Sequence, residues 1–218
     1  MSVRGALRIA FADFYRQSWR LFLLNAALSG FVVALLLVGA RVPVALALLV
    51  LAGPLAAALM HCAVTLAQTE DLRLGEAITG LRLHWRRGLA LGAGALAVVA
   101  VGLTGLVEYG RAGTWAWPLA VLTFYVLAAF ALLQLALWPL AVFERERRLS
   151  AVVADAARAL IRRPAGFAAL GLALTLVNLL GAAAALAPLL TLTVAYSALA
   201  AAHYTLPRSP LREATTDG

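Results

Sequence analysis

Long apolar stretches without a charged residue are the feature that most constrains this chain. The longest runs from Pro164 to Pro207 and contains no Asp, Glu, Lys or Arg. Of the 218 residues 64% are hydrophobic and 13% are charged, against about 25% charged residues in an ordinary soluble domain. A soluble domain of this length cannot bury so much apolar surface. The sequence therefore predicts a membrane protein, and it excludes a soluble enzyme, a disordered chain and a disulfide scaffold.

The apolar pattern predicts an all-α, polytopic transmembrane bundle of six spans. A helix needs about 20 residues to cross a bilayer. The stretch Pro164–Pro207 is too long for one helix, so we divide it between Gly181 and Pro188 into spans five and six. The first four spans are expected at about Leu21–Ala40, Val44–Ala67, Leu89–Val107 and Pro118–Phe143.

Arginine is distributed unevenly among the segments between these spans. All 18 basic residues are arginines, and 16 of them lie at the N-terminus, on alternate loops and on the C-terminal tail. Only Arg41 and Arg111 lie on the other loops. Because cytoplasmic segments carry the excess of basic residues, we expect both termini in the cytoplasm. The net charge of +8 is then explained by the arginines between the spans and at the termini, and no nucleic-acid partner is expected.

A single transmembrane domain, residues 1–206, is expected to precede a short cytoplasmic tail, residues 207–218. The first apolar run begins only at Leu21, after Asp13 and four arginines, which favours a retained span over a signal peptide. The one cysteine, Cys62, lies within an apolar stretch, so the cysteine content says nothing about the redox compartment.

Three basic segments precede spans one, three and five and share one pattern. Each carries apolar or small residues at spacings of four, three and four, which is one face of a helix. We interpret the segments as three interfacial amphipathic helices, each opening a parallel repeat of elbow helix plus hairpin, at 5–68, 72–143 and 147–206. The alternative is that the stripes do not reflect a repeat, because any apolar chain with basic loops produces such stripes. The stripes are Leu7, Phe11, Phe14 and Ser18; Leu74, Ile78, Leu81 and Trp85; and Leu149, Val153, Ala156 and Leu160.

An arginine follows each stripe by two positions: Arg20, Arg87 and Arg162. An interfacial helix buries its apolar stripe at the headgroup boundary, so we expect these arginines to contact anionic lipid headgroups. The alternative is a cytoplasmic partner that docks on the basic face. In either case the sequence predicts the lipid bilayer as a partner.

Uncharged polar residues within the spans are candidates for a site. We expect them to form hydrogen bonds between helices, because a polar group in lipid must find a partner. The alternative is a polar vestibule open to the cytoplasm. Gly88 and Gly92, spaced as a helix-packing motif, are expected to permit close approach of span three to a neighbour. The polar candidates are Asn25, His61, Gln134, Asn178 and His203.

Catalytic patterns are missing from the sequence. The predicted hydrocarbon region holds no Asp, Glu or Arg, and therefore no carboxylate pair for acid–base chemistry. His61 and Cys62 are adjacent rather than at ligand spacing, and no third ligand completes a zinc site. We expect no enzyme activity, no cofactor and no metal.

Three segments, taken in order, resemble the YesL-type family of bacterial membrane proteins: DFYRQSWRLFLLN (Asp13–Asn25), GPLAAAL (Gly53–Leu59) and LGEAITGLRLHWRRGLALG (Leu74–Gly92). The usual family form near the second span is closer to TIGPATAAL, where this chain has LAGPLAAAL. The resemblance implies a protein of the bacterial cytoplasmic membrane, in a family catalogued as a domain of unknown function, without established catalytic residues.

Members of that family often occur near genes for sugar uptake and polysaccharide breakdown. The resemblance thus implies a non-enzymatic accessory or scaffold protein tied to carbohydrate or solute uptake, with a transporter complex as its partner. The alternative is a small transporter or channel with a cytoplasm-facing polar vestibule. The helix breaks at Gly53 and Pro54 favour that alternative, whereas the absence of embedded charge argues against it.

Overall fold

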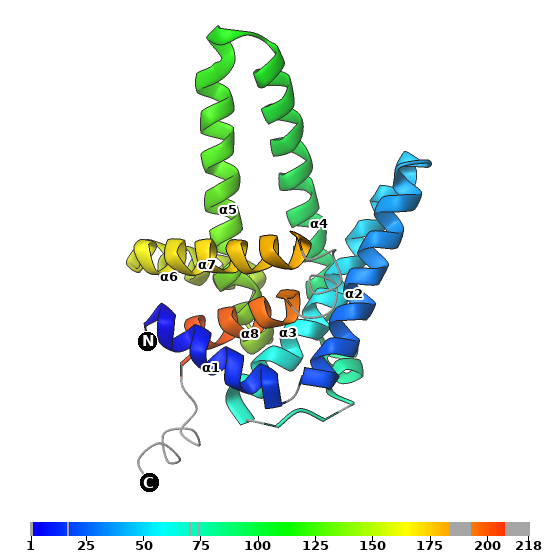
Figure 1. Cartoon of the computed structure of the whole chain (residues 1–218), viewed down its shortest axis with the longest axis vertical. Helices are drawn as coiled ribbons and strands as arrows, with labels where there is room; N and C mark the ends of the chain where they lie inside the picture. Colours follow the sequence, from blue (N-terminus) through cyan, green and yellow to red (C-terminus); the bar gives the residue numbers. More distant parts are fainter. Residues whose placement is uncertain (1, 17, 70, 74, 184–192, 208–218) are drawn as a thin grey trace.

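The computed structural model describes residues 2–16, 18–69, 71–73, 75–183 and 193–207, apart from the side chains of 18–20, 24 and 43–45. Every regular element in these ranges is helical, which confirms the all-α class (Figure 1). The elements are α1 (Val3–Arg16), α2 (Ser18–Gly39), the 3-10 helix η1 (Pro43–Leu51), α3 (Ala52–Thr69), α4 (Glu76–Arg111), the 3-10 helix η2 (Thr114–Ala116), α5 (Trp117–Phe143), α6 (Leu149–Arg162), α7 (Pro164–Ala183) and α8 (Val194–Thr205).

Five helical segments are long and apolar enough to cross a membrane. They correspond to the first five predicted spans, although α4 extends well beyond its span at both ends. The sixth span is not confirmed, because 184–192 lie outside the described residues and α8 alone has 12 residues. The segments are Leu21–Gly39, Leu46–Thr69, Glu76–Arg111, Thr114–Phe143 and Pro164–Ala183.

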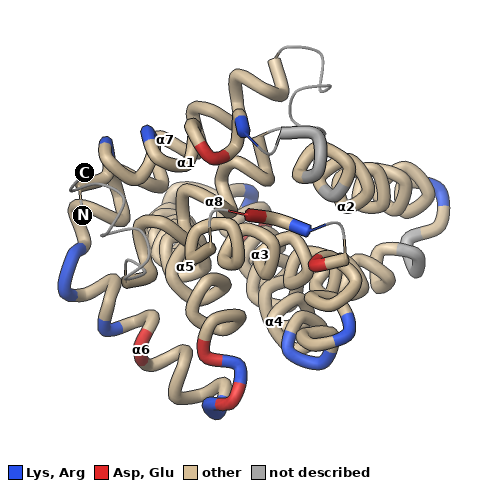
Figure 2. The backbone as a smooth tube through the Cα atoms, turned by 90° about the horizontal axis from the view of Figure 1, so that it is seen from below, with Lys and Arg blue, Asp and Glu red and all other residues tan. Residues whose placement is uncertain are grey.

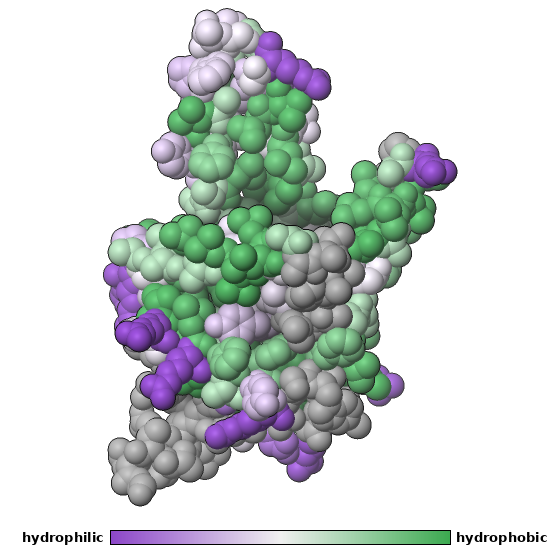
Figure 3. Space-filling view, in the orientation of Figure 1, coloured by the Kyte–Doolittle hydropathy of each residue, from purple (hydrophilic) through white to green (hydrophobic). Residues whose placement is uncertain are grey.

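The hairpin of α4 and α5 rises far above the rest of the molecule, and α2 with η1 forms a second, shorter projection (Figure 1). Both projections have apolar shafts and polar tips in the space-filling view (Figure 3). The taller tip follows the end of α4 at Arg111, and the shorter one follows the end of α2 at Gly39. The two arginines that sequence analysis separated from the other 16 thus belong to the tips.

The opposite end of the molecule carries the remaining charge. Seen from below, basic and acidic segments lie on α6, on the α5–α6 connection and along the first turns of α4 (Figure 2). Ion pairs hold this region together: the guanidinium of Arg147 lies 2.6 Å from Glu144 and 2.7 Å from Asp155. These two carboxylates raise the pKa of Arg147 by hydrogen bonding and by their charge. The pairs join the end of α5 to α6.

The core sits at the base, around α3 and α8. Most of α3 from Ala57 to Ala67 is buried, and α8 is buried from Ala198 to Tyr204. Alanine is the most frequent residue in both stretches, so neighbouring helices approach closely with little side-chain entropy lost. By contrast, only 6% of the most apolar stretch of α4 is buried within the chain. The stretch that contains α5 is buried to the same extent. The hairpin shaft therefore offers its apolar surface to its surroundings.

Glycines bring α3 and α4 together, as the Gly88–Gly92 motif predicts. A Cβ atom at Gly88 would lie 2.8 Å from the carbonyl oxygen of Gly53, and one at Gly92 would lie 2.8 Å from the Gly53 Cα atom. Real Cβ atoms do not make such short contacts, so only glycine fits on α4 at these two positions. The neighbour that α4 approaches is thus the start of α3, next to Pro54.

The threefold repeat is not confirmed. Its second amphipathic segment is continuous with span three within α4, because no proline separates the two. The third segment does end where expected: α6 stops at Arg162 and α7 begins at Pro164, since proline disfavours helix in the residue before it. However, α7 runs across the α4–α5 hairpin rather than alongside it (Figure 1).

Replacement of Gly88 by Ala is predicted to destabilise the protein by about 1–3 kcal/mol, because the added methyl group forces α3 and α4 apart. The matched control is Gly94→Ala on the same helix, where a Cβ atom meets nothing within 4 Å. Thermal unfolding in mild detergent measures both variants. Equal stability of the two would contradict the close contact described here.

Candidate functional site

The polar residues predicted within the spans lie at several helix contacts. His203, near the end of α8, places its Nε2 atom 2.9 Å from Oδ2 of Asp13 on α1. Both side chains are only 6% exposed. The Tyr196 hydroxyl, on the same helix, donates a hydrogen bond of 3.2 Å to the carbonyl of Leu7. These contacts join the first and last described helices.

A second polar contact joins α3 to α4. The Nε2 atom of His61 lies 3.4 Å from a carboxylate oxygen of Glu76, and its ring centre lies 5.2 Å from that of His84. His84 is buried, at 2% exposure, and its Nδ1 atom has no hydrogen-bond partner within the described part of the chain. Sequence analysis singled out His61 but neither of its partners.

Asn178 forms the third contact, between α7 and α8. Its side-chain amide donates hydrogen bonds of 2.9 Å to the Ser197 hydroxyl and 2.8 Å to the carbonyl of Leu174. Asn25 is fully buried on α2, and Gln134 is half-buried on α5. The side-chain oxygen of Gln134 has no hydrogen-bond partner among the described residues.

Three of the predicted polar residues make polar contacts between helices. His61, Asn178 and His203 each join a different pair of helices. None of these three residues lines the clefts beside Arg87 and Arg162 or the groove of the α4–α5 hairpin. Among the described residues, no three His, Cys, Asp or Glu side chains are grouped so that they could hold a metal ion.

Arg87 has a structural role that sequence analysis did not foresee. Its guanidinium donates hydrogen bonds of 2.8 and 2.9 Å to the carbonyls of Ala141 and Glu144, and a further one to the carbonyl of Arg147. The carbonyls at a helix C-terminus have no partner within the helix. Arg87 therefore caps α5 and fastens the base of the α4–α5 hairpin.

A cleft of about 310 Å³ lies beside this cap. Arg145 in its wall is paired with Glu146 at 3.8 Å, and the Arg86 guanidinium lies 5.2 Å from the centre of the Trp85 ring. Each of these cations already has a partner of opposite charge or an aromatic face. The cleft therefore shows no set of unengaged groups converging on a ligand.

The amphipathic segments bury faces that match the predicted stripes only in part. The buried residues of α1 are Ala6, Ala10 and Asp13, each one position before a stripe residue. Phe11 of that stripe is 64% exposed. In the second segment Ile78 and Trp85 of the stripe are 58% and 48% exposed. The third segment follows its stripe in part, because Ala156 is fully buried whereas Val153 is 36% exposed. Several large apolar side chains of the stripes are therefore exposed.

Of the other two arginines predicted to contact headgroups, Arg162 lies at the end of α6 and lines a cleft with Arg163. The side chain of Arg20 lies outside the described residues. Sequence analysis overlooked Arg163, Tyr204 and Thr205, which share the cleft with Arg162. The two adjacent arginines before Pro164 could have indicated this cleft. The sequence does not show, however, that α8 packs against them.

Comparisons with protein-family models, curated proteins and solved structures found no match to this chain.

The substitution Arg87→Gln is predicted to destabilise the protein by about 1.5–3 kcal/mol, because the carbonyls of α5 lose a charged donor. Its neighbour Arg86, which is exposed and stacks on Trp85, supplies the matched control. Arg86→Gln removes the same charge and is expected to shift stability by at most about 0.5 kcal/mol. Urea or thermal unfolding of both variants in mild detergent distinguishes a cap from a solvated charge; equal effects would refute the cap.

Proposed function

We propose that this chain is a multi-pass protein of the bacterial cytoplasmic membrane, with both termini in the cytoplasm. Support comes from the five apolar helices and from the separation of Arg41 and Arg111 from the other arginines. We propose further that it acts as a non-enzymatic accessory or scaffold protein of a carbohydrate or solute uptake system. That association rests on its resemblance to YesL-type proteins.

The exposed α4–α5 hairpin is the observation that best supports a scaffold. A groove of about 560 Å³ runs along its shaft, between Val101 and Gly105 of α4 and Leu122 and Val126 of α5. Gly102 has no side chain to hold α5 away, since a Cβ atom there would meet Leu127 at 2.5 Å. Helices in membranes associate by packing side-chain ridges into such grooves, especially beside small residues.

The proposed occupant of this groove is a transmembrane helix of a transporter subunit. The groove is mostly apolar, and the hydroxyl of Thr123 in its lining already donates to the carbonyl of Leu119 at 2.8 Å. Apart from the hydroxyl of Tyr109, it therefore offers mainly shape and dispersion contacts. An uptake system needs a membrane subunit, and an accessory protein that binds it within the bilayer needs such an apolar surface.

Purification of the tagged protein from native membranes in mild detergent is predicted to recover a transporter's membrane subunit in stoichiometric amount. Val101→Trp, which fills the groove at a residue that is 75% exposed, is expected to lose this partner. Leu103→Trp is the matched control, because Leu103 is 51% exposed on the same helix but does not line the groove.

Mass spectrometry of the three preparations identifies and quantifies the partner. Recovery of the protein alone, or only with itself, would contradict the accessory function and make flux measurements in liposomes the next experiment. Loss of the partner from both tryptophan variants would place the contact elsewhere on the molecule.

A further inference from the structure

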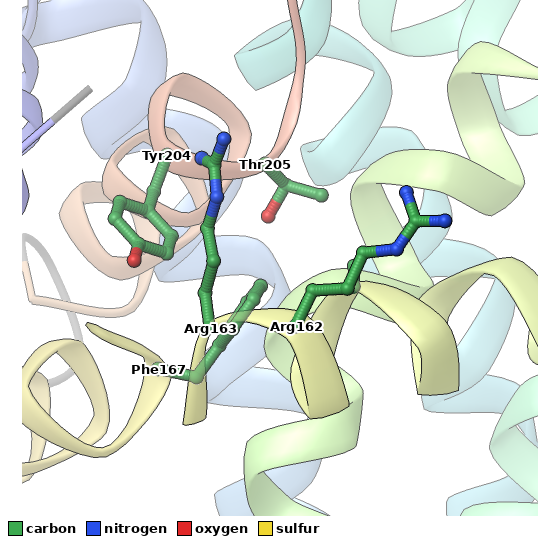
Figure 4. Close-up of a pocket in the computed structure, with 6 residues that line it drawn as sticks. Arg162, Arg163, Phe167, Tyr204 and Thr205 are labelled. Atoms are coloured by element: carbon green, nitrogen blue, oxygen red, sulfur yellow. The ribbon is translucent and has the colours of Figure 1, made fainter. Parts of the chain in front are cut away.

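A second polar cleft, of about 210 Å³, lies between the α6–α7 elbow and the end of α8. One wall comes from Arg162, Arg163 and Phe167 around the elbow, and the other from Tyr204 and Thr205. In Figure 4 the side chain of Arg163 rises between Tyr204 and Thr205, and that of Arg162 extends on the far side of Thr205. Two guanidinium groups thus stand on either side of one short stretch of α8.

Neither guanidinium is neutralised by the part of the chain that the structure describes. Arg162 and Arg163 form no ion pair and donate no side-chain hydrogen bond there. The acid on the same helix, Asp155, is held by Arg147 at 2.7 Å and by Arg158 at 2.6 Å. The cleft therefore has two positive charges and no carboxylate among its lining residues.

Aromatic packing fixes the shape of the cleft. The aromatic wall is rigid, since the rings of Phe167 and Tyr204 pack edge to face at 5.1 Å. Tyr204 is only 7% exposed, and its hydroxyl lies against Gly166, where a side chain would displace it.

Arg87 and Arg162 differ in what their guanidinium groups contact. Each follows its predicted stripe by two positions, and each lies near the end of another helix, α5 for Arg87 and α8 for Arg162. Arg87 uses its donors on backbone carbonyls, whereas those of Arg162 remain available. Arginine binds phosphate through two parallel hydrogen bonds, so a pair of available guanidiniums suits that group.

We propose that this cleft binds the phosphate group of an anionic phospholipid. The shared chemistry is a phosphate ester, and the lipid source is favoured by the membrane-length apolar helix α7 that follows the two arginines. Ile161, next to Arg162 in the chain, is 76% exposed. A lipid whose phosphate contacts the two arginines can cover this side chain with an acyl chain. This inference is independent of the proposed transporter partner.

Native mass spectrometry of the full chain in mild detergent tests the proposal with dioleoylphosphatidylglycerol and dioleoylphosphatidylcholine as probes. The wild-type protein is expected to retain phosphatidylglycerol preferentially. The double variant Arg162→Gln/Arg163→Gln is expected to bind it at least about tenfold more weakly, since two charged contacts are lost. Arg73→Gln/Arg82→Gln, which removes the same charge from exposed positions outside the clefts, is expected to bind within about twofold of wild type.

The following results would overturn the proposal. Equal retention of the two lipids by the wild type would remove the anion preference, and equal losses in both double variants would indicate general charge attraction. Displacement of the lipid by glycerol 3-phosphate or inorganic phosphate at matching concentrations would assign the cleft to a soluble phosphate ester. If the double variant unfolds, Arg162→Lys replaces it: this variant keeps the charge on an exposed side chain and is expected to bind several-fold more weakly, and unchanged binding would count against the site.

Discussion

Two helices approach to backbone distance where Gly53 of α3 meets Gly88 and Gly92 of α4, and the base of the molecule is built around that approach. In a bilayer the surrounding lipid is as apolar as a leucine side chain, so helices associate through close packing rather than through burial from water. Small residues provide that packing here. The alanine-rich stretches of α3 and α8 extend the same principle to α1, α2 and α5.

The contact also explains why the polar residues lie where they do. It aligns α3 with the first turns of α4, which brings His61 beside Glu76 and His84. One helical turn further along α4, Arg87 reaches the end of α5 and closes the base of the hairpin. The polar groups near the base thus hold helices together, while the apolar hairpin and the outward-facing stripe residues remain available to the surroundings.

Sequence analysis located the apolar helices and the packing glycines because hydropathy and the Gly88–Gly92 spacing are local properties. It could not foresee that α4 would continue through its basic segment, since a helix boundary without proline depends on tertiary contacts. Nor could it foresee that α7 would run across the hairpin. The direction of a helix depends on the helices that it packs against. Its apolar composition shows only that it is able to cross a membrane.

The candidate site was predicted less completely than the fold. Sequence analysis identified His203 and Asn178 as residues that bond between helices, but it named none of their partners. Asp13 lies 190 positions from His203 in the chain, and no local pattern connects them. Arg163 and Tyr204 were missed for the same reason, because their cleft forms only when the end of α8 packs beside the α6–α7 elbow.

The orientation of the arginine-rich base relative to the membrane is the claim on which the functional proposals depend. Single cysteines in a Cys62→Ala background test it, at Thr114 on the hairpin tip and at Ser150 on α6, both of which are exposed. In intact spheroplasts, a membrane-impermeant maleimide is predicted to label Thr114→Cys and to reach Ser150→Cys only after permeabilisation. Labelling of Ser150→Cys in the intact spheroplasts, with Thr114→Cys protected, would contradict a cytoplasmic base.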